Sequence, residues 1–254
     1  MSGLTLTLLA FQVSIFLEEL KDVYGLDYAF QKIDIFKGVQ KEEWFTKLNP
    51  NATVPVLIDH DNGGFAIMET NAILGYLRNK VDKKNEFWFE DDEAWVADMW
   101  MNWKQGGLAP IAAQANHFYR WCPTRYPYPT QRFLGETERL YGILDRRLQG
   151  RHYVAGKGRG KYSVADISIW PFIDGSGLLG LEMERWPDLY KWWERVGGRE
   201  AVKRGKMVPD GKEFEYGYEK VKEREGRGLS EEERGLREEG KKAMEEFGYV
   251  YKSP

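Results

Sequence analysis

Over the first eighty positions, short apolar runs that fit strands are followed by apolar residues spaced as on one face of a helix. An apolar run at Leu4–Leu9 predicts a strand. The next apolar residues recur at positions i, i+3, i+4 and i+7, which predicts a first helix through Val13, Phe16, Leu17 and Leu20. The chain therefore opens as a strand followed almost at once by a helix.

Further elements of the same kind follow. The pattern predicts a second strand at Tyr28–Ile35 and a short helix at Lys41–Lys47. A hairpin over residues 54–68 and a helix from Thr70 complete the order β-α-β-α-β-β-α. This is the order of an α/β thioredoxin-like unit, which we assign to residues 1–82.

The second half of the chain has helical spacing throughout. A charged connection, Val81–Asp92, precedes it. Four segments have apolar residues at helical spacing, namely Glu93–Asn116, Gln131–Leu148, Ser163–Leu179 and Pro187–Val196. We therefore expect an all-α domain at residues 93–210.

The tail over residues 211–254 differs in composition from the rest. More than half of residues 211–246 are Asp, Glu, Lys or Arg, and glycines are scattered among them. Some stretches favour helix, but their apolar stripe is thin. A charged, solvated extension is the expectation, with a partner-binding tail as the alternative.

Composition and charge exclude several classes of partner. The chain has 254 residues with 37 basic and 40 acidic side chains and a net charge of −3, so neither nucleic acid nor a membrane is expected as a partner. The run Leu4–Leu9 is too short for a membrane span and lacks the flanks of an export signal. The single cysteine, Cys122, excludes an internal disulfide framework and fits a cytoplasmic location.

The most informative stretch runs from Asn49 to Thr70. A proline cannot donate to a strand ladder, so Pro55 is expected at a strand start or edge, with the N–H and C=O of Val54 left free for a ligand. The polar turn at residues 60–64 and the apolar run after it predict a hairpin.

Directly after the hairpin, Glu69 and Thr70 open the next helix. A hydroxyl and free N–H groups at a helix start form a carboxylate site, and a neighbouring carboxylate can hold an ammonium group. With the backbone of Val54, they have the chemistry to clamp a zwitterion such as the γ-glutamyl head of glutathione. Taken alone, Thr70 also fits a plain helix N-cap.

These features resemble the glutathione transferase family. There, a Val-Pro with a cis proline pairs with the tripeptide backbone, and a Glu-Ser pair holds its γ-glutamyl end. Further motifs resemble the fungal branch related to the yeast nitrogen-regulatory prion protein and the bacterial nu class: Gln-Lys-Glu-Glu-Trp-Phe from Gln40, Asn-Pro-Asn from Asn49, the run Leu108–Phe118 and Val-Pro-Asp from Val208. The resemblance covers residues 4–210 and implies the two-domain fold of that family and a cis bond before Pro55.

The resemblance also implies glutathione as cosubstrate, with no metal. The implied glutathione-binding residues are Gln40, Thr53, Val54, Pro55, Glu69 and Thr70. Gln40 stands where this branch places a His or Gln near the glycine carboxylate, although alone it fits a polar residue at a helix start. Thr53 stands where some relatives have arginine, so one charge-assisted contact is missing.

The acceptor pocket is expected along the segment from Trp103 to Arg120. Its implied lining residues are Trp103, Gln114, His117 and Arg120. We interpret His117 as a hydrogen-bonded histidine between helices rather than as a general base. No spacing of His, Asp and Glu is typical of a metal site.

Thiol activation is where the sequence departs from the family pattern. An unperturbed thiol titrates near ~8.5, and relatives lower that value with a loop of the type Thr-Pro-Asn-Gly beside the sulfur. Here Leu4–Ala10 runs almost directly into Phe11, and most of that loop is absent. Gln12 and free helix N–H groups are the only local replacements, and Ser14 falls inside the helix as a packing residue.

The short loop leaves three alternatives open. Backbone donors and water activate the thiol; or the protein binds glutathione with little conjugation; or the sequence has lost a few codons.

A separate motif, Ser163-Val-Ala-Asp166, has the form of a capping box, so we interpret Asp166 as structural rather than catalytic.

Taken together, the sequence predicts a cytoplasmic, homodimeric glutathione transferase. The resemblance implies attack of the glutathione thiolate on a hydrophobic electrophile, or reduction of a disulfide or peroxide. A non-catalytic glutathione-binding regulator and a conjugating enzyme of a secondary-metabolite pathway are the alternatives.

Overall fold

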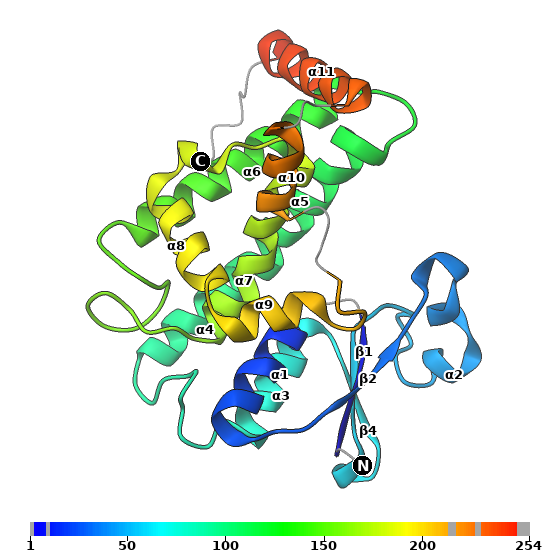
Figure 1. Cartoon of the computed structure of the whole chain (residues 1–254), viewed down its shortest axis with the longest axis vertical. Helices are drawn as coiled ribbons and strands as arrows, with labels where there is room; N and C mark the ends of the chain where they lie inside the picture. Colours follow the sequence, from blue (N-terminus) through cyan, green and yellow to red (C-terminus); the bar gives the residue numbers. More distant parts are fainter. Residues whose placement is uncertain (1–2, 9–10, 213–216, 227–229, 248–254) are drawn as a thin grey trace.

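A four-stranded sheet forms the centre of the first unit in the computed structural model, which describes residues 3–8, 11–212, 217–226 and 230–247 (Figure 1). The strands are β1 (Leu4–Leu8), β2 (Ala29–Lys32), β3 (Val56–Asp59) and β4 (Phe65–Met68), in the spatial order β2-β1-β3-β4. β1 runs parallel to β2, whereas β3 is antiparallel to both β1 and β4. The predicted thioredoxin-like arrangement is confirmed.

Helices cover both faces of this sheet. α1 (Phe11–Tyr24) and α3 (Thr70–Lys80) lie on one face, and the short α2 (Glu43–Thr46) lies on the other (Figure 1). Leu57 packs into the large core with α1 and α3, while its neighbour Val56 packs into a small core with α2. Successive residues of a strand point to opposite faces, so one strand supplies both cores.

β2 is shorter than the predicted strand Tyr28–Ile35. It ends at Lys32 because the Asp34 carboxylate accepts hydrogen bonds from the N–H groups of Phe36 and Lys37 and caps a 3₁₀ turn there. A short polar side chain thus diverts the backbone from the ladder.

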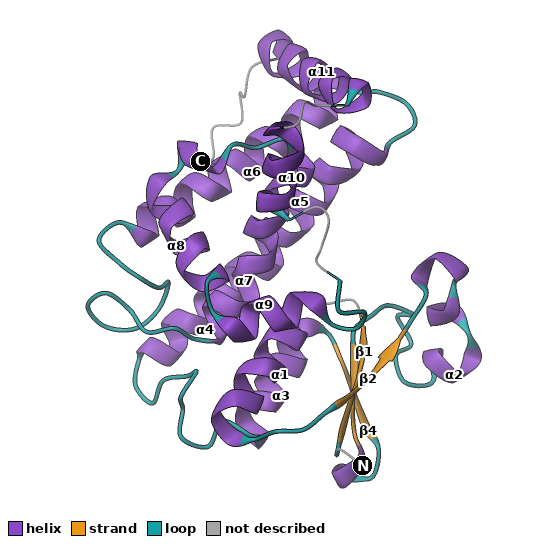
Figure 2. Cartoon of the chain, in the orientation of Figure 1, coloured by secondary structure: helices purple, strands orange, loops and turns teal. Residues whose placement is uncertain are grey.

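The second unit is helical, as Figure 2 shows, which confirms the expected all-α architecture. Its helices are α4 (Glu93–Trp103), α5 (Ala109–Asn116), α6 (Pro127–Leu148), α7 (Val164–Asp174), α8 (Pro187–Gly197) and α9 (Glu200–Met207). The predicted helix Glu93–Asn116 is interrupted by a π-helical turn at Lys104–Leu108, and a second π turn follows at His117–Trp121. α6 begins before Gln131 because prolines are tolerated in a first helical turn.

α9, which the apolar pattern did not predict, joins the helical unit to α1. Gly205 lies so close to α1 that a Cβ on it would be 2.6 Å from the Cα of Ile15. The Ser14 hydroxyl donates to the Gly205 carbonyl at 2.7 Å, so Ser14 is the packing residue that the sequence suggested. We call this contact of α1 with α9 the α1–α9 seam.

Three ion pairs join the two sides of the α1–α9 seam, one to the exposed Asp22 and two to buried glutamates. Arg199 donates twice to the Glu19 carboxylate, at 2.6 and 2.8 Å, and Arg204 donates to Glu18 at 2.7 Å. Both carboxylates are buried on α1. A buried carboxylate is tolerated only when it is paired, so these arginines fix the position of α9 on the α/β unit.

The charged tail is more ordered than the expected solvated extension. It forms α10 (Tyr218–Gly226) and α11 (Glu231–Phe247), and α11 packs across α6. Tyr218, Leu236 and Ala243 are buried. Ion pairs add to these contacts, among them that of Arg120 with Glu233 of α11.

Asp166 has the structural role predicted for it. The capping box with Ser163 is formed, and the Asp166 carboxylate also accepts from the Trp192 indole at 2.8 Å and from the Val154 N–H at 3.0 Å. Burial raises the pKa of Asp166 to about 6, although all of these donors oppose that shift. The group ties three segments of the helical core together.

Candidate functional site

The hairpin brings the two predicted halves of the glutathione site together. In the antiparallel register of β3 with β4, Val56 pairs with Met68. One step beyond this pair, Pro55 precedes β3 and Glu69 follows β4. The backbone at Val54 therefore lies beside the start of α3, which begins at Thr70.

The loop before β3 is held from within and leaves Val54 open. The buried Asn49 amide donates to the Thr53 carbonyl at 2.7 Å, while its oxygen accepts from the Asn51 N–H at 2.9 Å. The Val54–Pro55 peptide bond is cis, as expected. Neither the N–H nor the C=O of Val54 has a hydrogen-bond partner among the described residues.

The first turn of α3 is likewise open. Glu69, not Thr70, occupies the N-cap position, and its side chain makes no capping hydrogen bond. The first helical N–H that finds a partner is that of Ile73, so the N–H groups of residues 70–72 point out of the helix end without one. The plain N-cap alternative for Thr70 is therefore not what the structure shows.

Glu69 has an unusual backbone conformation, with φ 69° and ψ 123°. Such a conformation costs a non-glycine residue about 1–3 kcal/mol and is concentrated at functional sites. Only three described non-glycine residues have positive φ, and two of them, Ala52 and Glu69, adjoin the open backbone of Val54 and Thr70. The site is thus built from two locally strained segments that face each other.

The remaining predicted glutathione contacts are less open. The Gln40 amide N–H donates to the Ile35 carbonyl at 3.2 Å, while its buried oxygen has no partner among the described residues. The Thr53 hydroxyl is exposed but already accepts from the Asn49 and Asn51 amides, at 3.3 and 3.2 Å. Both side chains stabilise their own loops.

A buried lysine, which sequence reasoning missed, stands behind the start of α3. Lys104 is fully buried in the π turn, and its ammonium donates to the side-chain oxygen of Asn71 at 3.1 Å. Asn71 is the second residue of α3 and also contacts Ser168 and the Met101 carbonyl. The spacing in the sequence does indicate that Lys104 is buried, because it lies on one stripe at helical spacing with three buried apolar residues, Ala97, Met101 and Leu108.

The connection expected to hold the thiol-activating group is two residues long. β1 ends at Leu8 and α1 begins at Phe11, so Leu9 and Ala10 alone join them, and these two lie outside the described residues. Gln12, the weak catalytic candidate, is on the first turn of α1 and is 9% exposed. Its assignment stays a prediction.

The structure does not gather the predicted acceptor residues into one described pocket. Trp103 is half-buried against Trp100, and Gln114 and His117 are exposed. The expectation of a hydrogen-bonded histidine between helices is therefore wrong, because His117 contacts the ring of Phe118 on the surface. Arg120 instead forms an ion pair with Glu233 of α11 at 2.5 Å, so its charge is occupied by the tail helix.

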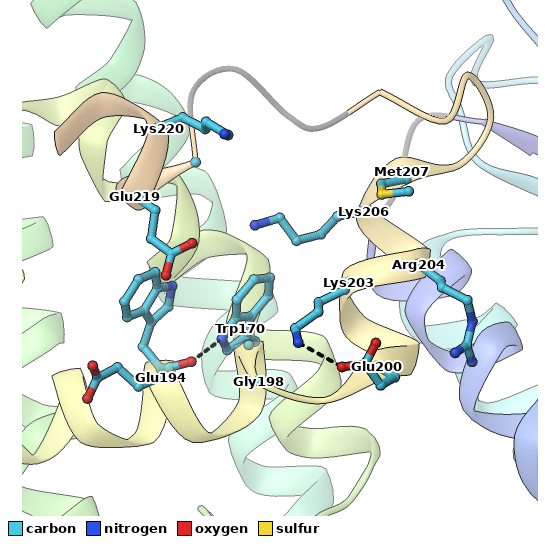
Figure 3. Close-up of a pocket in the computed structure, with 13 residues that line it drawn as sticks. Trp170, Glu194, Gly198, Glu200, Lys203, Arg204, Lys206, Met207, Glu219 and Lys220 are labelled. Carbon is cyan, nitrogen blue, oxygen red and sulfur yellow. Dashed lines mark hydrogen bonds and ion pairs between the residues drawn. The ribbon is translucent and has the colours of Figure 1, made fainter. Parts of the chain in front are cut away.

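A pocket in the described part of the chain lies elsewhere. It has a volume of about 600 Å³ and is formed by α8, α9 and the start of α10 (Figure 3). Trp170 lines it, and two of its lysines are paired: Lys203 with Glu200 and Lys206 with Asp174. None of the predicted glutathione residues lines it, so we interpret it as a crevice between helices.

Neither a metal-binding cluster nor a membrane-spanning helix occurs within the described ranges. No group of three or more His, Cys, Asp or Glu residues there could hold a metal ion. None of the helices there is long and apolar enough to cross a membrane. Cys122 is a free, buried thiol in the helical unit.

Comparison with known proteins identifies the class that this fold and site define. Residues 10–80 match the glutathione S-transferase N-terminal domain, and residues 130–200 match the glutathione S-transferase C-terminal domain. The disulfide-bond oxidoreductase YfcG of Escherichia coli is 33% identical over 196 residues, which span 75% of this chain and 86% of that protein. The chain belongs to the glutathione S-transferase family.

Two solved structures of similar fold contain glutathione or its oxidized form. A glutathione transferase homologue from Lodderomyces elongisporus, with two glutathione molecules per subunit, has a TM-score of 0.76 and 31% identity, over 82% of this chain and all of that one. The glutathione transferase URE2P8 of Phanerochaete chrysosporium, with oxidized glutathione, has a TM-score of 0.74 and 28% identity, over 81% of this chain and 94% of that one. The resemblance to this fungal branch is thereby confirmed.

Proposed function

We propose that this protein binds glutathione between the Val54 backbone and the start of α3. The observation that carries the proposal is the facing pair of open segments: a backbone N–H and C=O without partners at Val54, and a helix start without a cap at Glu69 and Thr70. Polar backbone groups in a folded protein are normally paired, so two such segments side by side favour a ligand.

The ligand chemistry follows from these groups. Val54 pairs as a strand edge does with an extended tripeptide, through one donor and one acceptor. The Thr70 hydroxyl and the free N–H groups of α3 bind the γ-glutamyl carboxylate, with the positive end of the helix adding to the attraction. The exposed Glu69 carboxylate binds the γ-glutamyl ammonium group. Gln40 and Thr53 stay secondary candidates for the glycine end.

The chemistry proposed is that of the ligand's own sulfur. The thiolate of glutathione attacks a hydrophobic electrophile and forms a thioether as the leaving group departs. It can also attack a disulfide, which releases one thiolate and leaves a mixed disulfide that a second glutathione resolves to oxidized glutathione. In the third proposed reaction, the thiolate attacks the O–O bond of a peroxide and releases an alcohol or water, and the resulting sulfenic acid condenses with a second glutathione to give oxidized glutathione and water. Cys122 is buried, and the relatives named disulfide-bond oxidoreductases favour the disulfide reaction.

The proposed reactions require activation of the glutathione thiol, and the pKa of the bound thiol is therefore the first quantity to test. Because only two residues join β1 to α1, we expect bound glutathione to keep a thiol pKa near its ordinary ~8.5. Conjugation of an aryl halide should be slow at pH 6.5 and rise steeply toward pH 9, while binding changes little. Inserting Thr-Pro-Asn-Gly between Ala10 and Phe11 should lower the apparent pKa by about a unit, worth ~1.4 kcal/mol.

A fast parent enzyme with an apparent pKa near 6.5 would contradict this expectation. It would show that Gln12, the N–H groups of α1 or another donor replaces the missing loop. Glutathione binding with negligible turnover of both an aryl halide and a model disulfide would instead support the second candidate, a glutathione-binding regulator. The short connection before α1 favours that candidate over a highly active conjugating enzyme.

We also propose that the protein is a cytosolic homodimer. Large apolar side chains are exposed on two elements that lie at the edge of the α/β unit and at the start of the helical unit: Phe65 and Met68 on β4, and Trp95 and Met99 on α4. Large exposed apolar side chains that are close together on one element are typical of interaction sites. Sedimentation of the parent and of Phe65→Glu measures the assembly; a monomeric parent at micromolar concentration would contradict it.

A further inference from the structure

Lys104 is a buried cation with an unusual set of partners. Its side chain is fully buried, and its ammonium donates to two amide oxygens, of Asn71 at 3.1 Å and of Gln105 at 3.0 Å. The Phe172 ring lies 5.5 Å from the ammonium nitrogen. No carboxylate of the described chain pairs with it, although a buried ammonium ordinarily requires an acidic partner.

The charged groups on the surrounding helices do not supply that partner. Burial alone lowers the pKa of Lys104 to about 8, without a contribution from any other charge. α5 carries no ionisable side chain. The carboxylates on the other helices packed around the π turn have partners of their own or are partly exposed: Asp166 and Asp174 on α7, Glu136, Glu138 and Asp145 on α6, Glu93 and Asp98 on α4, and Glu69 at the start of α3.

The Asn71 contact points this unpaired charge at the glutathione site. Asn71 follows Thr70 directly, and its backbone N–H is one of the open donors of the first turn of α3. Its side chain makes three hydrogen bonds to the helical unit, with Lys104, Ser168 and the Met101 carbonyl. Lys104 is the first residue of the π turn, and such turns occur frequently at functional sites.

We propose that Lys104 is a positioning residue for the ligand carboxylate: through Asn71 it fixes the first turn of α3, and its positive charge is compensated when an anionic γ-glutamyl carboxylate binds there. The proposal rests on the proposed glutathione site and deepens it. The missing counter-ion of Lys104 is then the substrate. The positive charge of a buried ammonium acts over a few ångströms with little screening, so direct contact with the ligand is not needed.

This assignment predicts a pH dependence with a definite sign. A bound carboxylate stabilises the protonated form of Lys104 and so raises its pKa above about 8. By linkage, the ligand binds better when Lys104 is protonated, and affinity should fall as the pH rises through and above 8. The ammonium group of the γ-glutamyl head loses its proton in the same range, so the contribution of Lys104 is the part of this pH dependence that a variant without the lysine charge lacks.

The test is calorimetric titration with S-methylglutathione from pH 6.5 to 9.5. This probe has no free thiol, so the titration of the sulfur does not contribute. Three chains are compared: the parent, Lys104→Gln, which keeps an amide donor for Asn71 without the charge, and Lys104→Met, which keeps neither. The control ligand is S-methylglutathione with its γ-glutamyl α-carboxylate converted to the amide.

At pH 6.5 we expect Lys104→Gln to bind S-methylglutathione about tenfold more weakly than the parent, since a charged group contributes roughly 1–2 kcal/mol more than a neutral donor. Lys104→Met should bind more weakly still. The differences should shrink to about twofold or less at pH 9.5, because the parent lysine is then largely neutral. With the amide ligand, the parent and Lys104→Gln should differ by less than about twofold at every pH.

Equal affinity and equal pH profiles for the parent and Lys104→Gln would overturn the proposal and leave the glutathione site standing. A loss that is the same for both ligands and at every pH would also overturn it, since a purely structural role has that result. A parent chain that binds neither glutathione nor S-methylglutathione would overturn the proposed function, and this inference with it. Unfolding midpoints in urea confirm that each variant is folded.

Discussion

At the α1–α9 seam the buried polar groups have partners within the chain, whereas around the start of α3 several do not. Glu19 is bound by Arg199, Glu18 by Arg204, and the Ser14 hydroxyl by a carbonyl of α9. At the other region, the Val54 backbone and the first N–H groups of α3 are open, and Lys104 has only amide oxygens as partners. The α1–α9 seam lies between the α/β unit and the helical unit. The start of α3 lies at the edge of the α/β unit, where Asn71 contacts Lys104 of the helical unit.

The difference separates architecture from recognition. A buried charge with a partner fixes one element on another, and its removal is felt as lost stability. A polar group left open costs stability in the free protein, and that cost is recovered when a ligand supplies the partner. Substitutions in the first region should therefore lower the unfolding free energy, whereas substitutions in the second should lower ligand affinity and leave the unfolding free energy unchanged or raise it.

The largest effect is expected from breaking one ion pair of the seam. Arg199→Met leaves the Glu19 carboxylate, which is only 3% exposed, without its partner. An uncompensated buried charge costs about 3–5 kcal/mol of unfolding free energy, which urea unfolding at pH 7 would measure. Glutathione affinity of the remaining folded protein should be close to that of the parent.

The matched control removes both charges. Arg199→Met with Glu19→Gln should recover most of the loss, because no ion is then left buried. A double variant as unstable as Arg199→Met alone would show that the stacking of Arg199 on Tyr162, 3.9 Å away, matters more than the charge pair.

Lys104→Met should change the unfolding free energy in the opposite direction to Arg199→Met. Burial lowers the pKa of Lys104 from its ordinary 10.5 to about 8, so the folded state resists the charged form, and its removal should stabilise the protein by about 3 kcal/mol at pH 7. The stability of the parent should rise between pH 8 and 10.5, where the unfolded chain holds the proton and the folded chain does not. The difference between the two chains should therefore narrow over that range, and a constant difference would contradict the account.

A smaller effect is expected where α9 approaches α1. Gly205→Ala places a methyl group 2.6–2.7 Å from the Cα and N of Ile15, and the helices must move apart at a cost of about 1–3 kcal/mol. Gly75→Ala in α3 is the matched control, because nothing lies within 4 Å of its Cβ position. It should stabilise α3 by up to about 1 kcal/mol. Equal melting temperatures for both variants would show that the seam is not tightly packed.

From the sequence, the α1–α9 seam could hardly be predicted, whereas the hairpin and the start of α3 could. The hairpin from Pro55 to Met68 and the proximity of Val54 to Thr70 could be predicted, since turn residues and a proline at a strand start fix the register locally. α9 could not, because it buries only a narrow face through Ala201, Val202 and Gly205. The tail helices were missed for the same reason: charged residues dominate them, and ion pairs to distant elements stabilise them.

The site was missed where the helix departs from ordinary geometry. The π turns at residues 104–108 and 117–121 change which side chains face inward, and no sequence pattern marks such a turn. His117 is the first residue of the second π turn and is exposed. Lys104 lies on the buried stripe of α4, and it was missed because a lysine is not expected at a buried position. Arg120 was assigned to the acceptor pocket because its partner, Glu233, lies 113 residues further along the chain.

The most direct test of the central claim is a glutathione titration of the parent chain and of the variants Thr70→Ala and Glu69→Ala, with urea unfolding of each. We expect the parent to bind glutathione and each variant to lose about 1–3 kcal/mol of binding free energy, at least several-fold in affinity. Unfolding free energies should stay within about 0.5 kcal/mol of the parent for Thr70→Ala, because its hydroxyl has no partner in the described structure. Affinities equal to that of the parent in both variants would contradict the account.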